Sequence, residues 1–248
     1  FGTQSDAPDH PELLDWLAIE FREQGMSLKK LHRLIVTSAT YRQDSKVSKE
    51  LLARDPANRL LARGPRHRLD AEVIRDLMLK ASGKLSPKMY GPSVYPPQPA
   101  SVTAVAYGAT KWNVSKGEDR YRRSLYTFSK RTAPFAAFTT FDASSGEGCI
   151  ARRNRSNTPL QALTLLNDAM FVELAQHLAL EAEKMSVEKR IEFLFRKFLA
   201  RPPSFKEVAL MKQYLDTQRQ RLGKGELKAS QIMGQKHATT EQAALALL

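Results

Sequence analysis

Arginine is the residue type in this sequence best suited to binding chemistry, because arginines gather between residues 120 and 155. Planar guanidinium groups bind phosphate, sulfate or carboxylate through paired hydrogen bonds. The last of them precede Thr158, which with Pro159 and Gln161 has the form of a helix-starting capping box, and free amides at a helix start also favour anions. We therefore expect an anion-binding site formed by Arg120, Arg122, Arg123, Arg131, Arg152, Arg153, Arg155 and Asn157.

Two other interpretations of these arginines stay open. In the first, they face solvent or form ion pairs with the nearby acids Glu118, Asp119, Asp142 and Glu147. In the second, they bind nucleic-acid phosphates while bases stack on Tyr121, Tyr126 and Phe128. Nucleic acid is the less favoured partner, because no helix-turn-helix, RNP-type strand or zinc-finger spacing accompanies the arginines.

Other chemical patterns are weak, and no catalytic residue is assigned. The histidines are scattered and form no HxxxH or HExxH pair, so we expect no metal site. Cys149 lacks a recognisable partner motif and is expected to be a buried, inert thiol. Asp119, Asp142 and Asp168 could serve as an acid and base on a sugar, although for Asp168 we favour a structural role in which it bonds a neighbouring turn or an arginine.

Composition bounds the class of protein. A chain of 248 residues, 42% hydrophobic, can bury a core as one large domain or two small ones. The net charge of +13 implies attraction to nucleic acid, a membrane surface, an acidic polysaccharide or an acidic domain. A single cysteine excludes an intrachain disulfide and a CxxCH haem site. No run approaches the roughly 20 apolar residues of a membrane span, and the given residues contain no signal-peptide pattern.

Hydrophobic periodicity predicts helices in the first third of the chain. Helical spacing indicates a hairpin of two helices between Leu13 and Ile35, with Gly25 at the turn. Asp55 begins a short segment through Leu61, and a further helix follows Asp70 and ends before a glycine. We expect four helices and an N-terminal helical part over residues 1–83.

Residues 84–156 differ from the first third of the chain in composition and in hydrophobic periodicity. Prolines and glycines cluster near its start, which disfavours regular helix, and the helical period fades. Short β-branched or aromatic runs predict two strands, at 102–107 and 125–128, and SSGEG from Ser144 is typical of a turn. This part is expected to be an irregular, arginine-rich insert, and long ordered inserts of this kind are often functional.

Periodicity returns in residues 157–248. One amphipathic helix is predicted from Thr158 to about Met185, with its apolar face at Leu163, Leu166, Met170, Leu174 and Leu178. Two helices follow, the second capped by Ser204 and closed by Gly223, then a linker and a final helix. The expected fold class is mainly α: one composite helical domain with a loop-rich, proline- and glycine-rich insert carrying two short strands.

Several long segments together resemble a known family, the planctomycete-type domain of unknown function found C-terminal in planctomycete cytochrome c domain-containing proteins. The resemblance covers nearly the whole chain in the right order. It rests on HPELLDWLA from His10, NRLLARGPRHRLDAEVIRD from Asn58, SGKLSPKMYGPSVYPP, EDRYRRSLYTFSKRTAP and RNRSNTPLQALTLLND. The chain departs from the family pattern at FDASSGEGC from Phe141, where an acidic and basic pair is expected.

The resemblance implies the C-terminal module of a larger exported bacterial protein, hence an extracytoplasmic location, although the sequence shows no signal peptide. The start at Phe1 and the end within AALALL also suggest a piece of a longer chain. It implies preceding domains of the same polypeptide as partners. Any c-type haem would sit in a separate domain, with no cofactor in this chain.

Three functional hypotheses follow, and whether the chain is an enzyme is left open. In the first, the module binds or acts on carbohydrate, including anionic carbohydrate, with the arginine-rich insert as its ligand-binding or domain-docking face. The second is a basic nucleic-acid-binding module. The third is a purely structural brace between domains.

Overall fold

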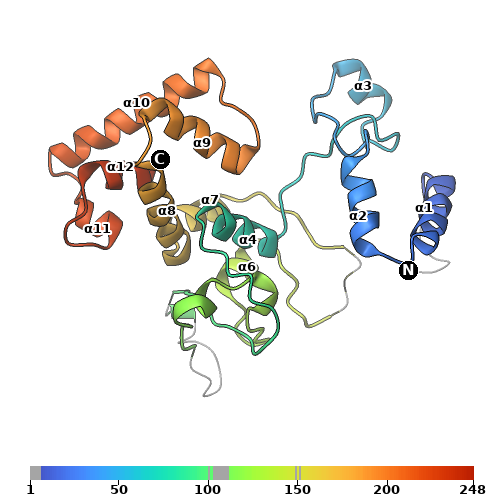
Figure 1. The fold of residues 1–248 in the computed structure, drawn as a ribbon, viewed down its shortest axis with the longest axis horizontal. Helices are drawn as coiled ribbons and strands as arrows, with labels where there is room; N and C mark the ends of the chain where they lie inside the picture. The colour runs from blue at the N-terminus through green and yellow to red at the C-terminus, as the bar shows by residue number, and fades with distance from the viewer. Residues whose placement is uncertain (1–6, 100, 103–111, 149, 151) are drawn as a thin grey trace. The chain divides into compact units, whose positions relative to one another are not determined.

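The computed structural model describes residues 7–99, 101–102, 112–148, 150 and 152–248, and it is mainly helical (Figure 1). Within these residues there are eleven α-helices, which confirms the expected fold class. The chain folds as two compact units, Phe1–Arg68 and Leu69–Leu248. Each unit is described by itself. The predicted division at residues 83 and 156 stays a prediction.

Unit 1 contains the predicted helical hairpin, formed by α1 (Pro11–Glu23) and α2 (Leu28–Thr37). Gly25 adopts a left-handed backbone at the turn, and the Ser27 hydroxyl caps α2. The third helix, α3 (Lys49–Arg54), ends where the sequence predicted a segment to begin. Asp55 instead terminates it, because its buried carboxylate accepts the amides of Arg59 and Leu60 and turns the chain.

The irregular part of unit 2 packs against α4 (Ala71–Ala81), whose position agrees with the sequence prediction. Its regular pieces are short: η2 (Gly117–Tyr121), η3 (Ser124–Tyr126) and α6 (Ala136–Thr140). The core here joins Leu79 of α4 to Phe135, Phe141 and Phe171. Short elements and stacked rings, rather than a sheet, therefore fill this half of the unit.

The two predicted strands are not formed as strands in the described residues. Val102 lies in a helical turn, and residues 103–111 are outside the described part of the chain. The run at 125–128 begins in η3 and then makes a single parallel bridge between Thr127 and Val94. A second bridge joins Ser86 and Arg122. Neither bridge extends because no neighbouring described segment continues the ladder.

Arg75 in the middle of α4 holds the irregular segment in place. Its side chain is 1% exposed, and its Nη1 donates to the carbonyl of Arg122 at 2.7 Å. Nη2 donates to the carbonyl of Arg120 at 3.3 Å, and the guanidinium also reaches the Ser124 hydroxyl and the Met170 sulfur. One buried cation thus supplies donors to a stretch of backbone that has no sheet partner for them.

The long helix predicted from Thr158 to about Met185 is instead two helices, α7 (Pro159–Asn167) and α8 (Ala169–Ala182). Asp168 lies between them with an extended backbone, and its carboxylate accepts the amide of Met170 at 2.9 Å to cap α8. The break divides the apolar face that the sequence predicted for one continuous helix. Leu163 and Leu166 are 54% and 71% exposed, whereas Met170 and Leu174 are buried. Asp168 therefore has the structural role the sequence favoured.

The C-terminal half of unit 2 contains α9 (Val187–Leu199), α10 (Phe205–Gly223), α11 (Ala229–Met233) and α12 (Thr240–Leu247) (Figure 1). The predicted linker includes α11, and its Met233 is 1% exposed. That buried side chain joins a second apolar cluster with Leu215, Leu222 and the alanines of α12. Helix α8 contributes to both clusters, through Leu174 and Ala179.

We predict that Arg75→Met lowers the free energy of unfolding by about 2–3 kcal/mol, because the carbonyls of Arg120 and Arg122 lose their donors in a buried place. Burial lowers the pKa of Arg75 to about 10, so the wild-type guanidinium remains charged at neutral pH. Urea unfolding followed by circular dichroism measures the change. Arg196→Met, which removes an exposed pair with Glu192, is the control and should cost less than about 1 kcal/mol. Equal effects would contradict the role given to Arg75.

A second prediction concerns the α7–α8 break. Asp168→Ala should destabilise the protein by about 1 kcal/mol through loss of the cap, whereas Asp168→Asn, an equally good cap, should not. Burial raises the pKa of Asp168 above its usual value. The carboxylate is therefore disfavoured in the fold at neutral pH, and the wild type should gain stability over Asp168→Asn as the pH falls toward about 4. Thermal melts of both proteins between pH 4 and 8 test this. A wild type that becomes less stable than Asp168→Asn as the pH falls would refute the prediction.

Candidate functional site

Three acids at the N-cap and in the first half of α4, rather than the start of α7, attract arginines of the predicted cluster. The strongest pair joins Arg153 to Glu72, with Nη1 to Oε2 at 2.6 Å and Nη2 to Oε1 at 3.0 Å. Looser pairs join Arg123 Nε to Asp76 at 3.6 Å and Arg155 Nε to Asp70 at 3.7 Å. Asp70 precedes the helix, and Glu72 and Asp76 lie one turn apart on it, so the three arginines gather along the first two turns of α4.

Arg120 and Arg122 bind elsewhere in unit 2. Arg120 forks onto Glu173 of α8, which also accepts the Tyr121 hydroxyl. Arg122 is 1% exposed, lies 3.7 Å from the Tyr126 ring centre, and donates to the carbonyls of Tyr90 and Pro92. These two side chains hold α8 and the irregular backbone in place.

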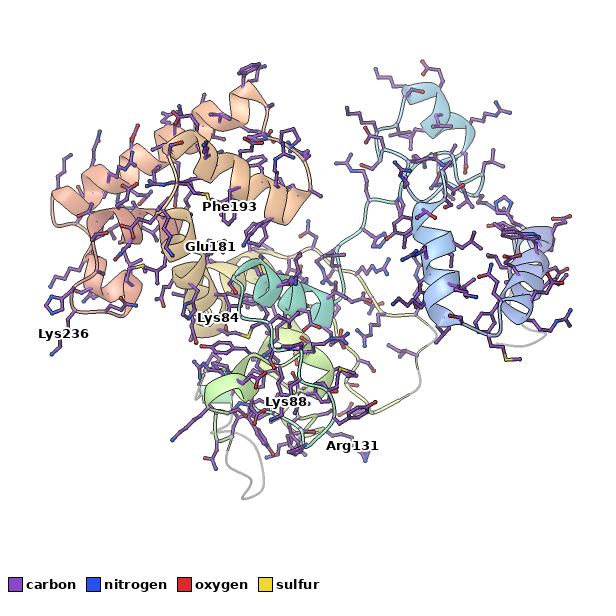
Figure 2. All side chains as sticks on the ribbon, in the orientation of Figure 1. Lys84, Lys88, Arg131, Glu181, Phe193 and Lys236 are labelled. Atoms are coloured by element: carbon purple, nitrogen blue, oxygen red, sulfur yellow. The ribbon has the colours of Figure 1, made fainter. Side chains whose placement is uncertain are left out.

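The remaining predicted residues, Arg131, Arg152 and Asn157, are exposed. Arg131 is labelled in Figure 2 together with Lys88, which pairs with Asp119. The acids that the sequence offered as partners have other contacts: Glu118 accepts the Ser86 hydroxyl, and Asp142 accepts the amide and hydroxyl of Ser156. The structure thus brings Arg123, Arg153 and Arg155 to α4, and Arg120 and Arg122 to separate partners.

The start of α7 offers few donors to an anion. The predicted capping box is present, with the Gln161 amide donating to the Thr158 hydroxyl and the Thr158 amide donating to Gln161 Oε1. Pro159 has no amide hydrogen. The Gln161 side chain also donates to the Ser156 hydroxyl, which itself bonds Asp142. The polar groups here satisfy one another and fix the chain between α6 and α7.

A cavity of about 310 Å³ lies beside the Arg153–Glu72 pair, between the start of α4, η3 and α6. Its lining includes the Glu72 carboxylate and hydroxyl-bearing serines and threonines from separate segments, with Phe128 and Phe138 as the apolar wall. The exposed hydroxyl residues of the lining are Ser129, Thr139, Ser144 and Ser145. The Thr127 hydroxyl is buried beneath the surface and has no hydrogen-bond partner among the described residues. We call this space the Glu72 cavity.

Arg153 sets the charge and the position of Glu72. Burial would raise the pKa of Glu72, but hydrogen bonds from Arg153 and the backbone outweigh it and hold that pKa below its usual value. The same hydrogen bonding from Glu72 raises the pKa of Arg153. The cavity therefore presents an ionised carboxylate in a fixed orientation at neutral pH, which can accept hydrogen bonds from hydroxyl or amino groups.

Sequence reasoning missed Glu72 and Thr127. The spacing of Glu72 and Asp76 is a readable signal, because residues four apart lie on one face of a helix, and Asp70 marks the start of that helix. Their pairing with arginines from much later in the chain depends on the fold. Thr127 carries no such signal, because the burial of its hydroxyl depends on segments that the fold brings around it.

Metal and membrane features add nothing to this site. Across the described ranges, no group of three or more histidine, cysteine or acidic side chains could hold a metal ion. No helix found there is long and apolar enough to cross a membrane. Cys149, considered above as a buried thiol, lies outside the described residues.

Comparison with known proteins gives one match. A family model described as PSD1, protein of unknown function (DUF1553), matches residues 1–215. Neither a curated protein nor a solved structure is significantly similar to the chain. The match extends through unit 1 and most of unit 2, and it includes every residue of the Glu72 cavity.

The Arg153–Glu72 pair predicts a pH-dependent stability. Because the pKa of Glu72 is lowered in the fold, the pair should stabilise the protein above pH of about 4.3, and the gain should vanish as the pH falls through the lowered pKa. We expect Glu72→Gln to cost about 1 kcal/mol at pH 7 and clearly less at pH 3. Urea unfolding at both pH values measures this.

Glu188→Gln is a suitable comparison, since Glu188 is an exposed helical acid paired with Lys212. Its effect at pH 7 should be smaller than that of Glu72→Gln, because water screens an exposed pair more strongly. A cost for Glu72→Gln that persists unchanged at pH 3 would show that the ion pair is not its source.

Proposed function

We propose that this chain, which belongs to the DUF1553 family of unknown function, is a carbohydrate-binding module that uses the Glu72 cavity. The observation that carries the proposal is the lining of that cavity: a carboxylate fixed by a bidentate arginine, hydroxyls from several segments, and phenyl rings. No metal or nucleophile motif accompanies these groups in the sequence. We therefore propose binding rather than catalysis.

The lining matches the two chemical sides of a sugar ring. A pyranose presents hydroxyls around its edge and C–H groups on its faces. Glu72 can accept hydroxyl hydrogens, the exposed Ser129, Ser144 and Ser145 can each donate and accept, and Phe128 and Phe138 supply flat apolar surface. A volume of about 310 Å³ lies at the small end of ligand cavities, which suits a single sugar unit.

In this proposal the arginines hold the acids at the start of α4 in place and do not themselves contact the sugar. Arg153 holds both oxygens of Glu72, and Arg155 and Arg123 engage the neighbouring acids of α4. Their positive charges are balanced by α4, which leaves less for the phosphates of nucleic acid. Arg131 and Arg152 are exposed, so each remains able to contact a neighbouring domain.

The wider setting is also a proposal. The family resemblance supports an origin in an exported planctomycete protein that carries a cytochrome c domain before this module. In that arrangement any haem belongs to the separate domain, and the module works outside the cytoplasm. Binding of a polysaccharide by the module would then hold a redox domain close to it.

Isothermal titration of the purified chain with a panel of defined mono- and oligosaccharides tests the proposal. Arg153→Ala should weaken binding by about 10- to 100-fold, because the carboxylate loses the hydrogen bonds that orient it. Arg152→Ala, which changes an exposed arginine next to it, should leave affinity unchanged. If the chain instead binds polyanions in general, and that binding weakens steeply as the salt concentration rises, the result would indicate nucleic-acid binding.

Two outcomes would refute the proposal. The first is no binding to any member of the panel by a folded wild-type chain, which would favour a structural brace. The second is an equal loss of affinity in Arg153→Ala and Arg152→Ala, which would assign binding to general positive charge. Circular dichroism of each variant confirms that the comparison is between folded proteins.

A further inference from the structure

We infer that the hairpin of α1 and α2 in unit 1 is a surface for self-association, on which a second copy of this chain docks to complete a four-helix bundle. The two helices are neighbours in the chain and lie side by side (Figure 1). The inference does not rest on the proposed function, because every residue that lines the Glu72 cavity belongs to unit 2.

Unit 1 has no apolar core within its described residues, 7–68. The buried residues there are Asp55 and Gly64, and no apolar side chain is buried with them. Folding depends mainly on the removal of apolar surface from water, so a unit without buried apolar side chains lacks the main source of stability. A partner that covers the apolar side chains of unit 1 would supply it.

Each helix of the hairpin carries an apolar stripe, formed by residues three and four positions apart that share one helix face. The members are Leu14, Leu17 and Phe21 in α1, and Leu28, Leu31 and Ile35 in α2. Leu14 is 57% and Leu28 is 61% exposed, whereas Leu17 and Leu31 are half-buried. The contact between the two helices therefore covers one part of each stripe and leaves the other part open to a partner.

The two helices carry opposite net charges. Helix α1 has four acids and one arginine, whereas α2 has two lysines, one arginine and no acid. Among the described residues, no ion pair joins a charge of α1 to a charge of α2. The acids of α1 are therefore not neutralised by the cations of α2, and both helices can still attract oppositely charged groups on a partner.

Opposite charges on one hairpin make its surface complementary to a second copy of itself. In a dimer with twofold symmetry the same surface meets itself, so α1 of each copy can lie beside α2 of the other. Acidic and basic helices then alternate around a four-helix bundle, and the open parts of the apolar stripes fill its centre. Placing the two α1 helices next to each other would set acids against acids, so charge selects the alternating arrangement.

The same charges make other partners poorer fits. An anionic membrane surface and a nucleic acid would each attract the bases of α2 but repel the acids of α1. A second copy satisfies both helices at once, and it also buries apolar surface on both copies. Self-association is therefore the use of this hairpin that agrees with its charge and with its uncovered apolar stripes.

Sedimentation velocity of the whole chain from about 1 to about 100 μM tests self-association. We expect a dimer at the upper end of this range and dissociation on dilution. Leu28→Gln should weaken the dimer at least about tenfold, because it places an amide among the apolar side chains at the centre of the bundle. Leu166→Gln is the matched control, because it changes an exposed leucine of α7 in unit 2 and should leave dimerisation unchanged.

A pair of charge-reversed variants tests the arrangement of the helices. In the first, acids of α1 become lysine, and in the second, cations of α2 become glutamate. The substitutions are Glu12→Lys, Asp15→Lys and Glu23→Lys in the first variant, and Lys29→Glu, Lys30→Glu and Arg33→Glu in the second. Each variant alone has two helices of like charge and should dimerise at least about tenfold more weakly than wild type. An equimolar mixture should recover the wild-type affinity to within about threefold, because α1 of each variant then meets an oppositely charged α2.

Each result decides the inference. A chain that stays monomeric at about 100 μM would overturn it and would show that something other than a second copy covers the apolar stripes. A dimer that Leu28→Gln does not weaken would assign the interface to another surface and overturn it as well. A mixture that remains monomeric, although circular dichroism shows that both variants are folded, would overturn the alternation of acidic and basic helices. The sugar titrations test the proposed function separately, because its cavity lies in unit 2.

Discussion

The buried guanidinium of Arg75 is the constraint on which the rest of unit 2 depends. An irregular segment cannot satisfy its own backbone as a helix or sheet does, so its carbonyls need donors from outside. Arg75 supplies them to Arg120 and Arg122 from the middle of α4. Arginine suits this task because its donors are fixed in one plane and point in several directions. Once the segment is tied to α4, the 3-10 turns, the two bridges and the Glu72 cavity have defined places.

Charge compensation along α4 explains how so basic a chain builds a carboxylate-lined cavity. The net charge of +13 belongs to the whole molecule, but local fields depend on which groups lie within a few ångströms. Near α4, arginines from later segments face Asp70, Glu72 and Asp76. The result is a set of paired charges with one carboxylate exposed to the cavity. Overall charge thus describes how the protein behaves at long range, and it does not describe its ligand.

Helix α8 connects the two halves of unit 2. Its first turns carry Met170 and Leu174 into the cluster with the phenylalanines, and Ala179 further along joins the C-terminal helices. The break at Asp168 makes this possible, because a continuous helix would keep Leu163 and Leu166 on the face of Met170 and Leu174. Instead α7 leaves those leucines exposed and devotes Gln161 to the polar network at the end of α6.

The sequence alone determined the mainly helical class, the caps at Thr158 and Ser204, the hairpin of α1 and α2, and the structural role of Asp168, because caps and apolar periodicity are local properties. It also pointed to the arginines between residues 120 and 155 as candidate binding residues. Only the tertiary structure decided which acids they meet, since Arg153 and Glu72 lie 81 positions apart and nothing in either local pattern names the other. The α7–α8 break, the replacement of strands by bridges and the unpartnered Thr127 hydroxyl likewise arise from long-range packing, which outweighs local propensity wherever side chains from distant segments share one core.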